Sequence, residues 1–153
     1  MRRRLPLAEL AVAAAVALWP RHHAAASAMR ASWTRTPGVI NPDVTQATVR
    51  STICRSGFTR TIRPPHEYTD DLKRKQLREY GFGGAPSQYQ EDHLISLELG
   101  GHPTDPRNLW PERRPRAEDV DRIENQLNDA ICAGRMSLRD AQRKISEIKH
   151  TQG

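Results

Sequence analysis

The chain has 153 residues, of which 37% are hydrophobic and 27% charged, and its mean hydropathy is −0.74. This length favours one domain, and the absence of any uncharged apolar stretch of about 18 residues argues against a membrane-spanning enzyme. The formal net charge of +6 supports a nucleic-acid partner only weakly, because half of it belongs to residues 1–28, which hold four arginines and one glutamate.

Residues 1–28 have the layout of a secretory signal. A basic start is followed by an Ala, Val and Leu run from Leu10 to Trp19, and Ala26-Ser27-Ala28 offers the small residues that a signal peptidase reads. We therefore expect an exported protein, periplasmic or secreted, with residues 29–153 as a single mature domain. The paired arginines leave a twin-arginine route open. Glu9 within the apolar run leaves open a disordered N-terminus instead.

Proline and glycine divide the first half of the mature chain into short elements. Residues 29–44 are predicted to form an irregular arm, and residues 44–54 are ambiguous between a helix and a strand, because their Thr and Val residues favour extension. Residues 58–62 predict a short strand that ends before two prolines. Thr69 is the predicted N-cap of a helix that ends at Gly81.

The second half predicts two short extended segments, at residues 89–94 and 108–110, and then two helices. The first helix spans about residues 117–132, where apolar residues share one face, and Gly134 is a natural stop after it. Ser137 is the predicted cap of the second helix. Strands followed by helices indicate an α+β fold, in which helices pack around a small two-stranded unit.

Cys54 and Cys132 are the only cysteines, and both lie in the predicted mature domain. In an oxidising compartment, such a pair predicts one disulfide, which would close a loop of roughly 80 residues. Two buried free thiols in a cytosolic protein are the alternative. Neither cysteine belongs to a CxxC pair, so the pattern does not favour zinc or thioredoxin-like chemistry.

The chemistry-bearing motif runs from the first predicted extended segment into the second. Its residues, in order, are Asp92, His93, Ile95, Gly100, Gly101, Asn108 and Leu109. An acid beside a histidine, a Gly-Gly loop and a later Asn-Leu pair resemble the HNH nuclease family, whose fold is called ββα-metal. Segments on either side, around Cys54 and Ala141, are similar to a group of small exported bacterial HNH-like proteins.

This resemblance implies a role for each matching residue. It assigns Asp92 to a divalent metal ion, His93 to the general base, and Asn108 to orienting the loop that bears the histidine. The implied cofactor is one divalent cation, with Mg²⁺ or Mn²⁺ favoured and a transition metal possible. Neutral imidazole suits a base near pH 7. Adjacent strand residues point to opposite faces, so Asp92 and His93 share a site only at a strand end or kink.

One position departs from the family pattern. The family supplies a histidine or asparagine on the following helix, and the corresponding residue here is Ala117. On a helix with 100° per residue, Glu124 flanks the apolar face, so it is the predicted replacement ligand, with Asp121 next. The alternative for Glu124 is an ordinary surface carboxylate that pairs with Arg116 or Arg122.

Together these observations predict a monomeric, metal-dependent endonuclease that hydrolyses phosphodiester bonds in DNA, with RNA left open as a second substrate. The alternative is a secreted, non-catalytic binding or structural module on a degenerate HNH fold, in which the missing histidine marks lost activity. A plain nucleic-acid-binding domain is disfavoured, because the net charge of residues 29–153 is only +3 after subtraction of the first 28 residues.

Overall fold

The computed structural model describes residues 29–152, and these form a mixed α+β fold, as predicted. The predicted signal peptide lies outside the described residues. The helices and strands are α1 (Phe58–Ile62), α2 (His66–Tyr80), β1 (Tyr89–His93), β2 (Leu109–Arg113), α3 (Arg116–Cys132) and α4 (Leu138–Thr151). Single-turn 3-10 helices are η1 (Pro86–Gln88), η2 (Leu97–Leu99) and η3 (Pro106–Asn108). Within residues 29–152, no helix is long and apolar enough to cross a membrane.

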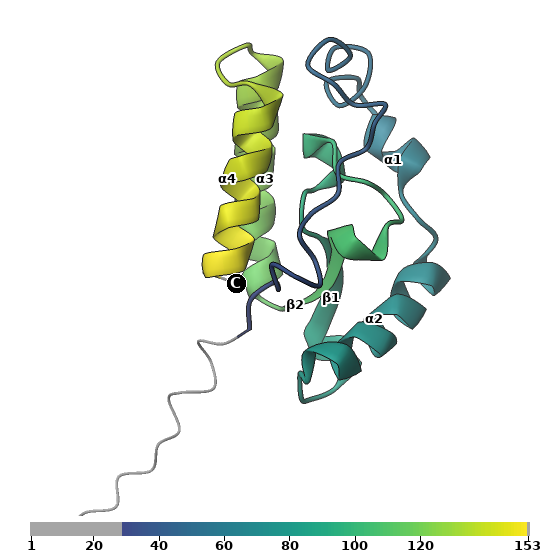
Figure 1. The fold of residues 1–153 in the computed structure, drawn as a ribbon. Coiled ribbons are helices and arrows are strands. Elements are labelled where there is room, and N and C mark those ends of the chain that lie inside the picture. Colours follow the sequence, from purple (N-terminus) through teal and green to yellow (C-terminus); the bar gives the residue numbers. More distant parts are fainter. Residues whose placement is uncertain (1–28, 153) are drawn as a thin grey trace, which may run out of the picture.

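The two predicted extended segments form an antiparallel hairpin. His93, the last residue of β1, pairs with Leu109, the first residue of β2, and Asp92 pairs with Trp110. The hairpin is joined by a long loop, residues 94–108, and α3 follows β2 almost directly. In space, α3 and α4 stand side by side on one side of the hairpin, and α2 lies on the other (Figure 1). The order of elements in this part of the chain is therefore strand, loop, strand, helix.

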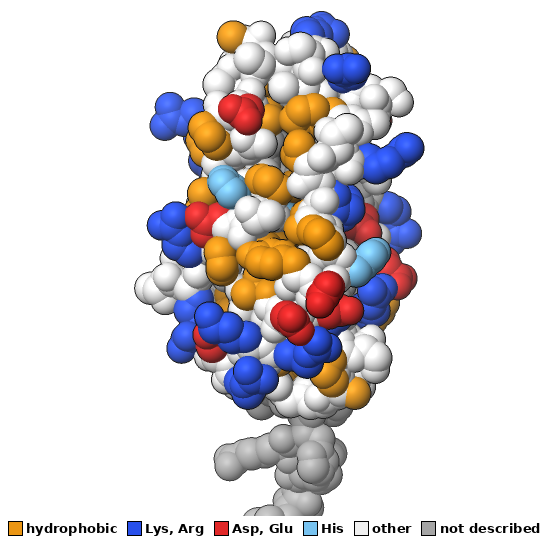
Figure 2. Space-filling view, turned by 90° about the vertical axis from the view of Figure 1, so that its right-hand side faces the viewer, with side chains coloured by type: hydrophobic (Ala, Val, Ile, Leu, Met, Phe, Trp, Pro, Cys, Tyr) orange, Lys and Arg blue, Asp and Glu red, His pale blue; other side chains and the backbone are white. Residues whose placement is uncertain are grey.

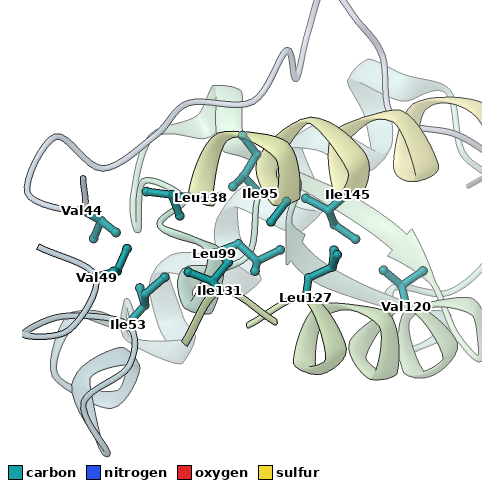
Figure 3. Packing of buried hydrophobic residues seen from close by; sticks show 11 residues of the cluster. Val44, Val49, Ile53, Ile95, Leu99, Val120, Leu127, Ile131, Leu138 and Ile145 are labelled. Atoms are coloured by element: carbon teal, nitrogen blue, oxygen red, sulfur yellow. The ribbon is translucent and has the colours of Figure 1, made fainter. Parts of the chain in front are cut away.

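The larger hydrophobic core lies between α3, α4 and the segments that precede α1. Apolar residues at helical spacing on α3 meet those of α4, so each helix buries one face. Ser137 caps α4 as predicted, with its Oγ accepting a hydrogen bond from the Asp140 backbone N–H at 3.1 Å. Figure 3 shows this cluster, whose buried members are Val44, Val49, Ile53, Ile95, Leu99, Val120, Leu127, Ile131, Leu138, Ala141 and Ile145.

The disulfide predicted between Cys54 and Cys132 is present. The two Cα atoms are 5.5 Å apart, within the range that a disulfide bridges without backbone movement. Free thiols are therefore excluded for this pair. The bond joins the segment before α1 to the last residue of α3, at the edge of the larger core.

The strand predicted at residues 58–62 is wrong, because this segment is helix α1. Its Thr and Ile residues favour extension, but β propensity needs a neighbouring strand to pair with, and none of its residues is buried. Gly57, with φ of 81°, lets the chain turn into the helix. Arg63 is extended and ends α1, because the residue before a proline is disfavoured in helices.

The start of α2 also differs from the prediction. Thr69 lies inside α2, where its Oγ donates a hydrogen bond to the His66 carbonyl at 3.0 Å, and Pro65 is the N-cap residue. Proline fixes φ at a value that suits a helix start, so the boundary moves to the Pro-His junction. Residues 44–54 are neither helix nor strand but successive turns. Gly81 ends α2 in the left-handed region, as predicted.

Replacing both cysteines with serine should lower the free energy of unfolding by about 4.5 kcal/mol on the chain-entropy model, because the bond spans a sequence separation of 78. Urea unfolding of the oxidised wild type and of the Cys54→Ser/Cys132→Ser variant measures this difference. Dithiothreitol should destabilise the wild type similarly and leave the variant unchanged. Equal stability of the two oxidised proteins would contradict a structural role for the bond.

Candidate functional site

Asp92 and His93 meet in one cleft at the end of β1. The cleft has a volume of about 270 Å³ and lies against α1, the loop after β1 and α3. Because the strand ends at His93, the two neighbouring side chains reach the same space, as the motif requires. Glu124 and Asp121 also line this cleft. Its other lining residues are Thr59, Arg63, Gln90, Ser96, Leu97, Glu98 and Asn125.

A backbone carbonyl fixes the tautomer of His93. Its Nε2 lies 2.9 Å from the Pro103 carbonyl oxygen. A carbonyl oxygen only accepts hydrogen bonds, so we assign the ring proton to Nε2, which leaves the lone pair on Nδ1. Burial lowers the pKa of His93 and outweighs the opposing effects of this hydrogen bond and of Asp92. The ring is therefore neutral at pH 7 and has one nitrogen able to accept a proton.

Asn108 braces the loop that carries the Gly-Gly pair. It is fully buried, its Oδ1 accepts hydrogen bonds from the backbone N–H groups of Ile95 at 3.0 Å and Val39 at 3.3 Å, and its Nδ2 donates to the carbonyls of Ile95 and His102 at 3.0 Å each. At Gly101, an added Cβ would lie 1.7 Å from the Ile95 carbonyl oxygen, so only glycine fits. This loop geometry places the Pro103 carbonyl that orients His93.

Lys149, at the C-terminal end of α4, places its ammonium among the carboxyl groups of the site. The side chain is completely buried. Its Nζ donates hydrogen bonds to Asp92 Oδ2, through a very short contact, and to the His93 carbonyl at 2.7 Å. Glu124 Oε1 lies 2.7 Å from Nζ, and Glu112 Oε2 lies 3.8 Å away.

Lys149 and Glu112 are site residues that were not predicted from the sequence. A signal for Lys149 exists: it lies four residues after the buried Ile145, on the apolar stripe of α4, where a lysine needs a buried partner. Glu112 lies two residues after Trp110 in β2, so it shares the inward face of the strand, and both side chains are fully buried. Fifty-seven residues separate Lys149 from Asp92, so no local pattern connects them.

The three acids of this cluster differ in their protonation state. Burial opposes ionisation of Asp92, but the ammonium of Lys149 outweighs it and holds the pKa of Asp92 below its usual value. Burial raises the pKa of Glu124 to about 8 and that of Glu112 to about 9, although Lys149 opposes both shifts. At neutral pH the cluster therefore holds one ion pair, Lys149 with Asp92, and two protonated glutamic acids.

The residues as arranged do not fit the divalent cation expected from the sequence. Within residues 29–152, no group of three or more His, Cys, Asp or Glu side chains is disposed to hold a metal ion. Glu124 and Asp92 line the same cleft, and the Nζ of Lys149 contacts both carboxyl groups. Asp121 is half-buried at the cleft wall, where burial raises its pKa. The ligand roles of Asp92, Glu124 and Asp121 stay predictions.

A second cleft, of about 290 Å³, adjoins the first and shares Arg63, Gln90, Asp92 and His93 with it. Its walls bring together the basic side chains Arg63, His66, Lys73 and Arg114 and the acids Asp70, Glu91 and Asp92. Burial raises the pKa of Glu91 to about 8, so this acid carries no charge at neutral pH. Lys73 forms an ion pair with Asp70, and Arg114 is 4.0 Å from Glu118. On the face that carries α1 and α2, basic side chains are spread widely and do not form one continuous patch (Figure 2).

Comparison with protein-family models, curated proteins and solved structures finds no match to this chain.

Stability should fall as the pH rises from about 5 to about 9, because Glu112 and Glu124 keep protons in the folded state that the unfolded chain releases. Their folded-state pKa values, about 9 and about 8, lie above the value of 4.5 for an ordinary glutamate, so a rising pH favours unfolding over this interval. Urea unfolding at several pH values measures the slope. Glu112→Gln should flatten it, whereas Glu147→Gln, on the exposed side of α4, should follow the wild type. Equal slopes for wild type and Glu112→Gln would contradict the assignment.

Proposed function

We propose that this protein is a nuclease that cleaves phosphodiester bonds with His93 as the general base. The observation that carries the proposal is the neutral imidazole of His93, held by the Pro103 carbonyl in a polar cleft with Nδ1 as its proton acceptor. A general base needs this combination of a fixed orientation, an accessible lone pair and a pKa near or below the working pH. The β–loop–β–helix order and the bracing by Asn108 support the same proposal.

Arg63 is the residue best placed to bind the phosphate. It is exposed, lines both clefts beside His93, and its positive charge adds to the lowering of the His93 pKa. A guanidinium offers several donors in a plane that matches phosphate oxygens, and it stabilises the charge that develops on them during attack. The first cleft is lined by acids, so a polyanion should enter through the basic second cleft and reach His93 at the junction.

The chemistry follows from these two side chains. Nδ1 of His93 takes the proton of the attacking oxygen while that oxygen bonds to phosphorus, and the bond from phosphorus to the leaving oxygen breaks. The leaving oxygen takes a proton from solvent. We propose DNA as the substrate, with water as the nucleophile. If a 2′-hydroxyl were the nucleophile, the substrate would be RNA. Export and a monomeric state belong to the same proposal, and the disulfide supports an oxidising compartment.

The second candidate function is a non-catalytic binding or structural module on the same fold. The observation that favours it is the ammonium of Lys149, which satisfies Asp92 and the His93 carbonyl while completely buried and so presents no positive charge to a substrate. In that case the cleft binds a partner without turning it over. Cleavage assays separate the two functions.

His93→Ala should lower the rate of DNA cleavage by about 100-fold or more, because a general base contributes at least that much. Arg63→Ala should also lower the rate, whereas Arg60→Ala, an exposed arginine one turn earlier, should not. The assay uses purified mature protein with supercoiled plasmid, single-stranded DNA and RNA, each with EDTA and with Mg²⁺ or Mn²⁺. Wild-type cleavage by His93→Ala would refute His93 as the base. No cleavage of any substrate by the wild type would favour the non-catalytic module.

A further inference from the structure

We infer that the ammonium of Lys149 is the resident cation of this site and takes the place of a divalent metal ion, so that the wild-type chain binds no divalent cation among Asp92, Glu112 and Glu124. This inference goes beyond the proposed function and stands whether or not the chain cleaves nucleic acid. We further infer that removal of the lysine side chain turns the same oxygens into a cation site.

The oxygens around Nζ come from three different elements. Asp92 and the His93 carbonyl belong to β1, Glu124 to α3, and Glu112 to β2. Carboxylate and carbonyl oxygens are the donors that hard divalent cations prefer. Lysine carries a compact point charge with three donors, so its ammonium can satisfy oxygens that converge on one point. The site therefore has the donors of a cation site and an amino-acid side chain as its cation.

Glu112 is the donor group that the ammonium holds least closely. Its side chain is fully buried, its Oε2 lies 3.8 Å from Nζ, and its carboxyl group forms a hydrogen bond with Asp92 instead. The cluster therefore contains more oxygen donors than the ammonium contacts directly. A divalent ion takes six or more oxygen ligands, some of them from water.

The ammonium cannot leave the site without unpacking one end of α4. Lys149 is completely buried, and its carbonyl accepts a hydrogen bond from the Ala31 N–H at 3.1 Å. The next residue, His150, contacts the Thr36 carbonyl at 3.0 Å and stacks on Trp33, with ring centroids 3.6 Å apart. The N-terminal arm thus holds this helix end in place. A divalent ion in solution would have to displace a packed side chain to bind.

The test measures metal binding and thermal stability instead of cleavage. Wild type, Lys149→Ala and the control Lys144→Ala, an exposed lysine on the same helix, are titrated with MnCl₂ by calorimetry, and their Tm values are measured with EDTA and with MnCl₂. Wild type and Lys144→Ala should show no Mn²⁺ binding and equal Tm values in both buffers. Lys149→Ala should have a lower Tm in EDTA and bind one equivalent of Mn²⁺, and a large excess should raise its Tm by roughly 5 °C or more.

Two results would overturn the inference. The first is that the wild type binds one equivalent of Mn²⁺ and that the Glu124→Gln variant does not. The metal ion would then have displaced the ammonium from the site. The other is Lys149→Ala that folds in EDTA but shows no gain in Mn²⁺ binding. If Lys149→Ala folds in neither buffer, the wild-type titration decides by itself. Because neither readout is cleavage, this inference and the proposed nuclease activity can fail separately.

Discussion

The buried ammonium of Lys149 joins the three parts of the molecule that make up the site. It attaches the end of α4 to β1 through Asp92 and the His93 carbonyl, and to α3 through Glu124. A buried ion pair contributes little net stability by itself, because desolvation of both charges offsets their attraction. Loss of one partner is different, because it leaves an uncompensated charge in the interior. Removal of Lys149 alone would therefore destabilise the arrangement of hairpin and helices.

A second constraint acts on the loop between the strands. Asn108 makes four backbone hydrogen bonds, and Gly101 approaches the Ile95 carbonyl too closely for any side chain. Together they fix the path of the loop as far as Pro103, whose carbonyl sets the tautomer of His93. The loop residues thus act on the chemistry indirectly, by deciding which ring nitrogen can accept a proton.

The electrostatics of the two clefts differ on either side of His93. Acids line the first cleft, and burial raises the pKa of several of them, including Glu98 and Glu124. Basic side chains, among them Arg63 and Lys73, line the second. In the proposed nuclease, a polyanion would approach from the second cleft, and His93 lies at the boundary between the two clefts. Figure 2 shows charged side chains spread broadly over this face.

The sequence by itself determined most of what depends on local patterns. Helical periodicity located α3 and the face of Glu124, Ser137 marked the start of α4, and the isolated pair of cysteines predicted the disulfide. The same local signals misassigned α1, because β propensity takes effect only where another strand is available to pair.

Only the tertiary structure determines that the positive charge at the site is the ammonium of Lys149. Lys149 and Glu112 reach Asp92 from distant parts of the chain, and a cluster of buried charges depends on packing that no periodicity describes. The motif and the helix periodicity predicted that Asp92, His93 and Glu124 lie in one site, because strand, loop and helix follow from neighbouring residues. The positive charge among those donors comes from the C-terminal end of α4. The position of this helix end results from the packing of the whole domain.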